Sequence, residues 1–523
     1  MAGTMNLYDL AYLFALIGST PYWLLRPSAR RKVAAALQDK PRRDGDAPTV
    51  MIHAVSLGEI NATRTLIDKL RVVMPGIHFV VSSTTDTGLA RAADLYAQQS
   101  DITLIRYPLD FSWEVTRTLE AVRPDVVALM ELEVWPNFMR ICSERQIPVL
   151  LINARLTETS FNRYCRLGPI ARKMFGRLTA VCAQEKSYAD RLLALGASPS
   201  RTRVTGTMKF DTSPVVTSIP GDLQLASEIG LDPFKEPIWV CGSTGPGEEL
   251  IILERYRAIL GRFPRLRLVI VPRKPERFDD VAALIVQHHF YVVRRSRAAR
   301  FSAGPIPPVI LGDTVGELKK FYSLASIVFV GRTLVDLGQR QAGSDMIEPA
   351  ALGKPVIVGP HTGNFAEPMR CFKAADAMLI VKDAEELEQA VAVLLSTPQQ
   401  AADIGRRAQQ VVRENQGATV RNGQILYDIL IDRILPPEAP PINPEAEAIA
   451  AAAITEEAPA PSPSAPPARA AAIPSAPRND DGPLPRPSPT PPPPARTLRG
   501  TSLADDLPPP DFIVPHDPPK PGA

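Results

Sequence analysis

The feature that most constrains the fold is a strand–turn–helix alternation that runs along the chain twice. Short apolar runs rich in β-branched residues are each followed by a helix-length segment. The first series has runs that begin at Thr49, Ile77, Ile102, Asp125, Ile147 and Leu178, and the second at Ile238, Leu266, Pro308, Ser326 and Pro355. This alternation indicates parallel sheets covered by helices on both faces. Because a proline-bearing break after Asp211 separates the series, we expect two doubly wound, Rossmann-like α/β domains facing a cleft.

Length and composition set the number of domains. The 523 residues exceed what one hydrophobic core usually holds. We therefore divide the chain into an N-terminal segment (residues 1–45), a first Rossmann-like domain (46–213), a second one (214–435) and a tail (436–523). Half of the 54 prolines lie in this tail, and Phe512 is its single aromatic residue. We expect the tail to be disordered, because it has too little apolar surface to bury.

Bulk charge and cysteines exclude several function classes. A net charge of +3 is too small to indicate a nucleic-acid partner. The five cysteines form no CxxC pair, so they predict neither a zinc site nor a disulfide framework, and they fit a reducing compartment. The chain contains no GxxxxGK[ST] motif, and the small-residue turn at Cys241–Glu249 is not a GxGxxG fingerprint, which disfavours P-loop and nicotinamide chemistry.

The first residues predict contact with a membrane. An apolar run from Leu7 to Leu25 is only marginally long enough to cross a bilayer, and no signal cleavage site follows it. Its basic flank consists of Arg26, Arg30, Arg31, Lys32, Lys40, Arg42 and Arg43. This flank places the body of the protein on the cytoplasmic side. We expect a helix that spans the membrane or lies in its surface, with a buried first helix as the alternative.

Polar residues follow the first two strands, at the edge where open α/β sheets bind ligands. Ser56 lies in the turn after the first strand, and Glu59 opens the next helix. Glu59 could be a general base or could only complement the helix dipole. Thr84 and Thr85 lie in a hydroxyl-rich loop that could meet a sugar or an anion, or could only cap a helix.

The later strands of the first series supply further candidates. Glu131, Glu133 and Trp135 follow the fourth strand, and a carboxylate beside an aromatic ring is typical of sugar sites, although packing is the alternative. Asn153, Arg155 and Lys209 follow later strands, and Lys209 could meet an anion.

The second series has its own set of candidates. Gly242, Ser243 and Thr244 belong to a small-residue turn that could cradle an anion. Arg273 and Lys274 lie just past the next strand. Glu348 could accept both hydroxyls of a ribose. The remaining candidates near a nucleotide phosphate are Gly331, His361 and Asn364.

Taken together, these motifs resemble a known family. Residues 5–430 carry, in order, HAVSLGE, SSTTDTG, ELEVWPN, NARL, VTGTMKFD, GSTGPGEE, VPRKPER and EPAALGKPVIVGPHTGNF. This combination resembles the Kdo (3-deoxy-D-manno-octulosonic acid) transferases of lipopolysaccharide assembly. The resemblance implies a GT-B glycosyltransferase that moves Kdo from CMP-Kdo to a lipid A precursor, lipid IVA, with inversion. It also implies the cytoplasmic face of the inner membrane and no metal or other cofactor.

The resemblance also implies residue roles. Glu59 would be the catalytic base, with Glu131 on the sugar side. The first domain would bind the acceptor through Ser56, Thr84, Thr85, Asn153, Arg155 and Lys209. The second domain would bind CMP-Kdo through Gly242, Ser243, Thr244, Arg273, Lys274, Gly331, Glu348, His361 and Asn364. The chain departs from the family at Gly245 and Lys274, where His is common, and at residues 331–333, where Gly-Gly-Ser is usual.

Two other readings remain open. A transferase or epimerase acting on another nucleotide sugar could share the architecture. A non-enzymatic scaffold could use the proline-rich tail, for example Pro491 to Pro494, to bind an unknown partner. Glu59 and Arg273 argue against the scaffold.

Overall fold

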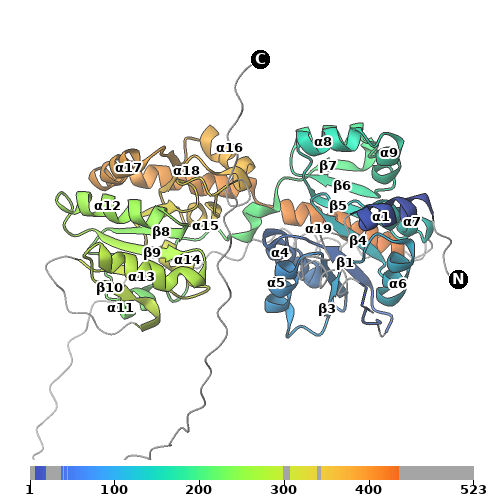
Figure 1. Cartoon of the computed structure of the whole chain (residues 1–523), viewed down its shortest axis with the longest axis horizontal. Coiled ribbons are helices and arrows are strands. Elements are labelled where there is room, and N and C mark those ends of the chain that lie inside the picture. The colour runs from blue at the N-terminus through green and yellow to red at the C-terminus, as the bar shows by residue number, and fades with distance from the viewer. Residues whose placement is uncertain are drawn as a thin grey trace, which may run out of the picture. The chain divides into compact units, whose positions relative to one another are not determined.

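The computed structural model describes residues 6–18, 37–38, 40–43, 45–297, 307–338 and 343–434 (Figure 1). In these ranges the chain forms two seven-stranded sheets, and all the strand pairs are parallel. The strand orders are β3-β2-β1-β4-β5-β6-β7 and β10-β11-β9-β8-β12-β13-β14. The prediction of two doubly wound α/β domains is confirmed.

The first half alternates strands and helices along residues 49–204. Its strands are β1 (Thr49–His53), β2 (His78–Ser83), β3 (Ile102–Arg106), β4 (Val126–Met130), β5 (Val149–Ala154), β6 (Ala180–Ala183) and β7 (Thr202–Val204). Its helices are α4 (Leu57–Val73), α5 (Asp86–Tyr96), α6 (Ser112–Val122), α7 (Pro136–Glu144), α8 (Glu158–Cys165), α9 (Pro169–Phe175) and α10 (Lys186–Ala194). Successive strand residues face opposite sides. Val50 and Ile52 therefore pack with α4 and α5, whereas Met51 packs with α6 and α7.

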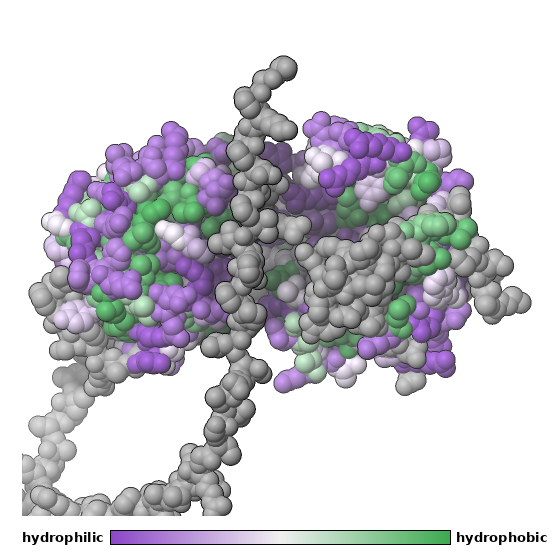
Figure 2. Space-filling model, in the orientation of Figure 1, coloured by the Kyte–Doolittle hydropathy of each residue, from purple (hydrophilic) through white to green (hydrophobic). Residues whose placement is uncertain are grey.

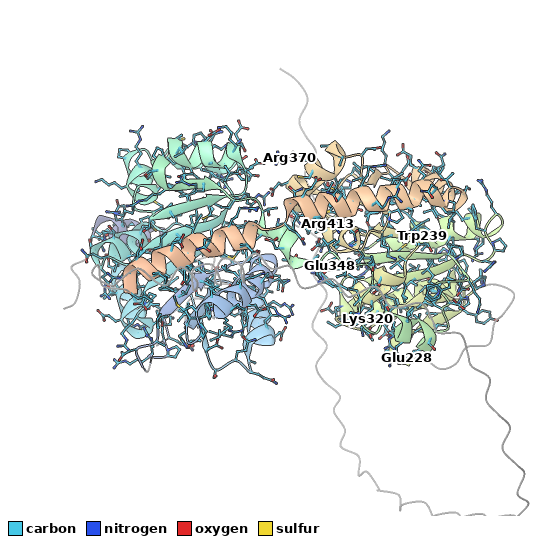
Figure 3. The ribbon with its side chains drawn as sticks, turned by 180° about the vertical axis from the view of Figure 1, so that it is seen from behind. Glu228, Trp239, Lys320, Glu348, Arg370 and Arg413 are labelled. Carbon is cyan, nitrogen blue, oxygen red and sulfur yellow. The ribbon has the colours of Figure 1, made fainter. Side chains whose placement is uncertain are left out.

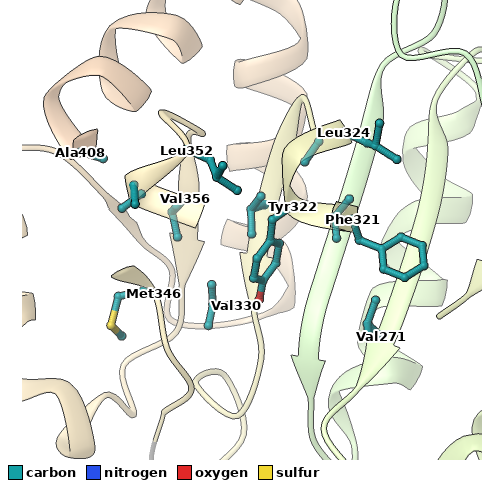
Figure 4. Packing of buried hydrophobic residues seen from close by; sticks show 14 of the residues in the cluster. Val271, Phe321, Tyr322, Leu324, Val330, Met346, Leu352, Val356 and Ala408 are labelled. Carbon is teal, nitrogen blue, oxygen red and sulfur yellow. The ribbon is translucent and has the colours of Figure 1, made fainter. Parts of the chain in front are cut away.

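The second half repeats this construction. Its strands are β8 (Ile238–Thr244), β9 (Arg267–Pro272), β10 (Val292–Arg294), β11 (Val309–Leu311), β12 (Ile327–Val330), β13 (Val356–Val358) and β14 (Leu379–Ile380). Its helices are α11 (Asp222–Glu228), α12 (Glu248–Leu260), α13 (Phe278–Gln287), α14 (Leu318–Leu324), α15 (Ile347–Ala351), α16 (Ala366–Ala374), α17 (Ala384–Ser396) and α18 (Pro398–Asn415). Residues of α11, α14, α15 and α18 cover one face of the sheet, and residues of α12, α13 and α17 cover the other. Figure 4 shows Phe321 and Tyr322 of α14 and Ala408 of α18 on the first of these faces.

The last described helix returns to the first half. Helix α19 (Ala418–Ile434) contacts α4, β4 and β5, and Figure 3 shows it in orange across the first sheet. Leu426 and Leu430 are fully buried in the core of that half. The sequence predicts this segment to be part of the second domain (residues 214–435), whereas it contacts elements of the first half. Its partners lie more than 200 residues earlier in the chain, so no local pattern could reveal the crossover.

Helix α1 (Leu7–Gly18) is fixed to the first half by a buried carboxylate. Asp9 accepts hydrogen bonds from the Ser112 backbone N–H at 2.8 Å and from the Asn137 side-chain amide at 3.0 Å. On the same helix Leu10 is 41% and Phe14 71% exposed, and hydrophobic colour gathers over α1 in Figure 2. Helix α1 therefore combines a polar contact with the first half and exposed apolar side chains.

In the described part of the chain, no helix combines the length and apolarity needed to cross a bilayer. The rest of the predicted apolar run and most of the basic flank (residues 19–36) lie outside the described residues, as does the tail from residue 435 onward.

Candidate active site

Glu59 lies just past the end of β1 and closes the first turn of α4. Its carboxylate accepts the backbone N–H groups of Val55 at 2.9 Å and Ser56 at 3.2 Å, while the Ser56 hydroxyl accepts the Glu59 N–H. This reciprocal arrangement is a capping box. Burial, and then the negative charge of Glu131, raise the pKa of Glu59 to about 7. Glu59 therefore caps its helix and is also poised to exchange a proton near neutral pH.

Glu131 belongs to a group of residues with strained backbone at strand ends. It follows β4 directly and has a φ of 55°; the other members are Asn153, Ser243 and Arg332. A left-handed backbone is uncommon for residues other than glycine, and it clusters at functional sites. Four more such residues in the described ranges follow helix ends, where this conformation is ordinary: Arg123, Gln146, His289 and Asp376. Each sheet thus carries two strained residues near the carboxyl ends of its strands.

The buried His53 lies close to Glu133, the second acid of the ELEVWPN motif. His53 ends β1, stacks on Tyr107 with ring centres 3.8 Å apart, and places Nε2 3.8 Å from the Glu133 carboxylate. The Trp135 indole donates to the same carboxylate at 3.1 Å. Burial tends to raise the pKa of Glu133, but the contacts with His53 and Trp135 bring it below its usual value. Glu133 is therefore held ionised, whereas Glu131 lies beside Glu59.

No sequence motif indicated a role for His53. The available signal was a lone polar side chain at the last position of a fully buried strand.

Three of the candidates for acceptor binding make hydrogen bonds with other residues of the chain. The Thr85 hydroxyl donates to the Val55 carbonyl at 2.6 Å and caps α5 through the Gly88 N–H at 3.0 Å. The Asn153 side chain accepts the Met208 N–H at 3.0 Å and is 2% exposed. The Thr84 carbonyl accepts from Arg106 at 2.8 Å, and its side chain is half-buried. Thr85 and Asn153 therefore support the loops around Glu59 rather than project from them.

The expected anion cradle in the second half holds the protein's own carboxylate. Glu248, the first residue of α12, is fully buried. Its two oxygens accept four backbone N–H groups, those of Gly245, Arg332, Thr333 and Leu334, at 2.6–3.0 Å. These amides are accordingly not available to a ligand phosphate.

Close packing explains the glycines of this region. The Gly331 N–H donates to the Gly242 carbonyl at 2.8 Å. A Cβ at Gly242 would collide with the Tyr322 hydroxyl, and one at Gly331 would lie 2.5 Å from the Thr244 Cα. Within the described chain, the Thr244 hydroxyl is buried without a hydrogen-bond partner. Gly242 and Gly331 thus permit close approach, while Thr244 keeps an unused polar atom.

A second pair of acids lies around the start of α15. Glu348, labelled in Figure 3, is half-buried, and burial followed by the charge of Asp345 raises its pKa to about 7. The positive charges of Lys319, 3.5 Å from its carboxylate, and of Arg273 oppose this rise. The hydroxyl of Tyr322, on α14, points toward the carboxyl ends of the strands of the second sheet (Figure 4). The structure thus brings the positive charges of Arg273 and Lys319 near Glu348, and no sequence motif indicated Lys319.

The remaining candidates are half-buried or exposed. Lys274 is exposed beside Arg273. Lys209 donates to the Asn364 carbonyl at 3.2 Å and lies over the Phe365 ring, so it contacts a donor-side loop although we assigned it to the acceptor side. The His361 N–H donates to the Thr333 carbonyl at 2.9 Å. Arg155 is half-buried next to the strained turn at Glu131, whose carbonyl accepts its N–H at 3.2 Å.

Known proteins resemble this chain over most of its described length. Residues 28–212 match the family described as 3-Deoxy-D-manno-octulosonic-acid transferase (kdotransferase). The 3-deoxy-D-manno-octulosonic acid transferase of Haemophilus influenzae is 34% identical over 384 residues, which cover 73% of this chain and 86% of that protein. The transferase of the same name from Bordetella pertussis is 32% identical over 414 residues, which cover 78% and 92%.

Two solved structures are also similar. The C-terminal CMP-Kdo binding domain of WaaA from Acinetobacter baumannii is 30% identical, with a TM-score of 0.34, and the match covers 36% of this chain and 95% of that one. UDP-GlcNAc 2-epimerase from Neisseria meningitidis bound to UDP-GlcNAc is 15% identical, with a TM-score of 0.49, and the match covers 73% and 100%.

Proposed function

Since the chain belongs to the 3-deoxy-D-manno-octulosonic-acid transferase family, we propose that it transfers Kdo from CMP-Kdo to the lipid A precursor lipid IVA, with inversion. One observation carries the chemical part of this proposal. Glu59 is a buried carboxyl group with a pKa of about 7, just past the carboxyl end of the interior strand β1 and beside a second acid. A group with these properties is suited to remove a proton from an alcohol at neutral pH.

In the proposed reaction, Glu59 accepts the proton of an acceptor sugar hydroxyl. The alcohol oxygen forms a bond to the anomeric carbon of Kdo while the bond from that carbon to the phosphate oxygen breaks, and CMP leaves with the electron pair. Two of the carboxylate's lone-pair positions are used by the Val55 and Ser56 N–H groups. About two positions remain for the incoming hydroxyl. The capping bonds thus fix the base without blocking it.

The second half supplies charge for the departing nucleotide. CMP-Kdo carries a phosphodiester and a carboxylate, and Arg273 and Lys319 are two cations beside Glu348. Fixed cations stabilise the charge that develops on a leaving phosphate. Glu348 accepts the ribose hydroxyls. We expect the reaction to need no metal ion.

We further propose that the enzyme works at the cytoplasmic face of the inner membrane. Its acceptor is an amphiphile, and α1 presents Leu10 and Phe14 outward while Asp9 fixes the helix to the first half. An apolar helix face of this kind lies in the interface of a bilayer. This orientation would bring the lipid headgroup to the domain that carries Glu59.

The direct test is a transfer assay with CMP-Kdo generated in situ and lipid IVA. We expect turnover by the wild-type chain and a loss of about 100-fold or more for Glu59→Ala, the scale of a general base. Glu120→Ala is the matched control, because Glu120 is an exposed glutamate of the same half.

Wild-type turnover with a UDP-sugar but not with CMP-Kdo would reject the proposed donor. Normal turnover by Glu59→Ala would remove this residue from the mechanism while leaving the donor assignment in place.

A further inference from the structure

A cavity of about 460 Å³ opens on the first half, away from the candidate active site. It is lined by Pro148, Thr179 and Arg201, which precede β5, β6 and β7. Because the strands are parallel, this is the amino-terminal edge of the sheet, opposite the edge that carries Glu59. An occupant here would not compete with the acceptor sugar.

The cavity combines positive charge with an apolar wall. Arg201 directly precedes β7, Arg203 lies in that strand, and Arg433 comes from the last turn of α19. Ile425 and Ile429, one helical turn apart on α19, supply the apolar part. Guanidinium groups favour carboxylates, with which they form paired hydrogen bonds. The three arginines outnumber the one acid of the lining, Asp432, so the lining suits an acidic segment with aliphatic side chains.

The chain itself supplies such a segment where it leaves the cavity wall. Helix α19 ends at Ile434. Residues 435–468 contain five glutamates and neither lysine nor arginine. The glutamates are Glu438, Glu445, Glu447, Glu456 and Glu457. Ile442, Ile449 and Ile454 are interspersed among them.

The direct connection to α19 favours this segment as the occupant of the cavity over a separate molecule. Glu438 is four residues past Ile434, so it can lie up to about 14 Å from the helix end. A short tether keeps the segment at a millimolar effective concentration around the cavity, so weak ion pairs suffice to populate the contact. We propose that residues 438–457 dock into the cavity formed by α19 and the amino-terminal ends of β5–β7.

The test places an amine in the cavity of the full chain. Arg203→Lys keeps the positive charge and adds a group that a carbodiimide joins to a nearby carboxylate with loss of water. We expect an amide between this amine and Glu438, Glu445 or Glu447, identified by mass spectrometry. Its yield should exceed that of the control Arg163→Lys, an exposed site on α8, by about fivefold or more, as a tethered contact predicts. In about 0.5 M salt the excess should disappear, because the contact is electrostatic.

Three outcomes would overturn the proposal. One is a yield equal to that of the control. Another is that a mixture of isotopically light and heavy chains gives cross-links only between copies, which would show that a second chain is the occupant. The third is that vesicles containing anionic lipid abolish the cross-link while Glu438→Gln, Glu445→Gln and Glu447→Gln leave vesicle binding unchanged, which would assign the cavity to a lipid headgroup.

Discussion

The two halves place a glutamate in the same position and use it differently. Glu59 and Glu248 both lie in the first turn of the helix that follows the first strand of their half, and both are buried. Glu248 is saturated by four backbone N–H groups and is fully inaccessible. Glu59 accepts two N–H groups, is 8% exposed and lies near Glu131. The comparison teaches that the number of amides around a buried carboxylate separates a structural acid from one that can still react.

The largest expected effect is the loss of folding stability when Glu248 is substituted. Glu248→Gln replaces one acceptor oxygen by an NH₂ group that faces backbone donors. We expect a loss of about 3 kcal/mol or more in the free energy of unfolding, since several buried charge-assisted hydrogen bonds are lost together. Urea unfolding monitored by the fluorescence of Trp239, in the adjacent strand β8, measures it. If Glu59→Gln destabilised the protein as much, amide saturation would not distinguish the two acids.

The next effect is the pH dependence of stability. The pKa of Glu59 is about 7 in the folded protein, and its ordinary value is 4.5. The protonated carboxyl therefore stabilises the folded state fully below pH 4.5, and this stabilisation is lost as the pH rises through about 7. Relative to Glu59→Gln, the wild type should lose up to about 3 kcal/mol over this interval.

Glu133 should show the opposite sign. Its folded pKa is lowered, so its contribution is present above pH 4.5 and is lost as pH falls through the folded pKa. Parallel unfolding curves of Glu133→Gln and Glu59→Gln at several pH values measure both. The same sign in both variants would contradict the assignment of ionised Glu133 and protonatable Glu59.

A smaller effect is expected at the donor cations. Lys319→Met removes the charge beside Glu348 and should raise the KM for CMP-Kdo about tenfold, the effect of one lost charge-assisted contact, with a smaller change in kcat. Lys320→Met, at the neighbouring position of α14, is the control. An equal change in both variants would show that net charge, not the contact with Glu348, is responsible.

The smallest effect is expected at the neighbour of Glu248. Glu249 pairs with Arg277 through two contacts of 2.7 and 2.9 Å, and that guanidinium is partly open to water. Glu249→Gln should cost only about 1–2 kcal/mol, because the remaining partner can be hydrated. A cost equal to that of Glu248→Gln in the same urea experiment would mean that burial alone, without the four amides, sets the stability.

Local patterns predicted the strands and the acids but not the long-range contacts. Glu59, Glu131 and Glu348 follow strands or open helices, so alternation alone placed them at one edge of each sheet. The three short edge strands β7, β10 and β14 escaped prediction because two or three residues carry too little periodicity.

The contacts between distant parts of the chain could not be predicted from the sequence either. Lys319 meets Glu348 from another helix, and α19 crosses to the first half. The small-residue turn at Gly242 predicted an anion, and the structure supplies one from inside the chain, Glu248. A glycine-rich turn before a helix therefore predicts a cluster of N–H donors, but not what accepts from them.

The pH dependence of kcat/KM for Kdo transfer tests the central claim most directly. If Glu59 is the base and Glu131 helps to raise its pKa, activity should rise with pH through about 7 in the wild type. In Glu131→Gln, which removes the neighbouring negative charge, the same limb should move to lower pH. An ascending limb that stays in place in Glu131→Gln, or that persists in Glu59→Gln, would contradict the account.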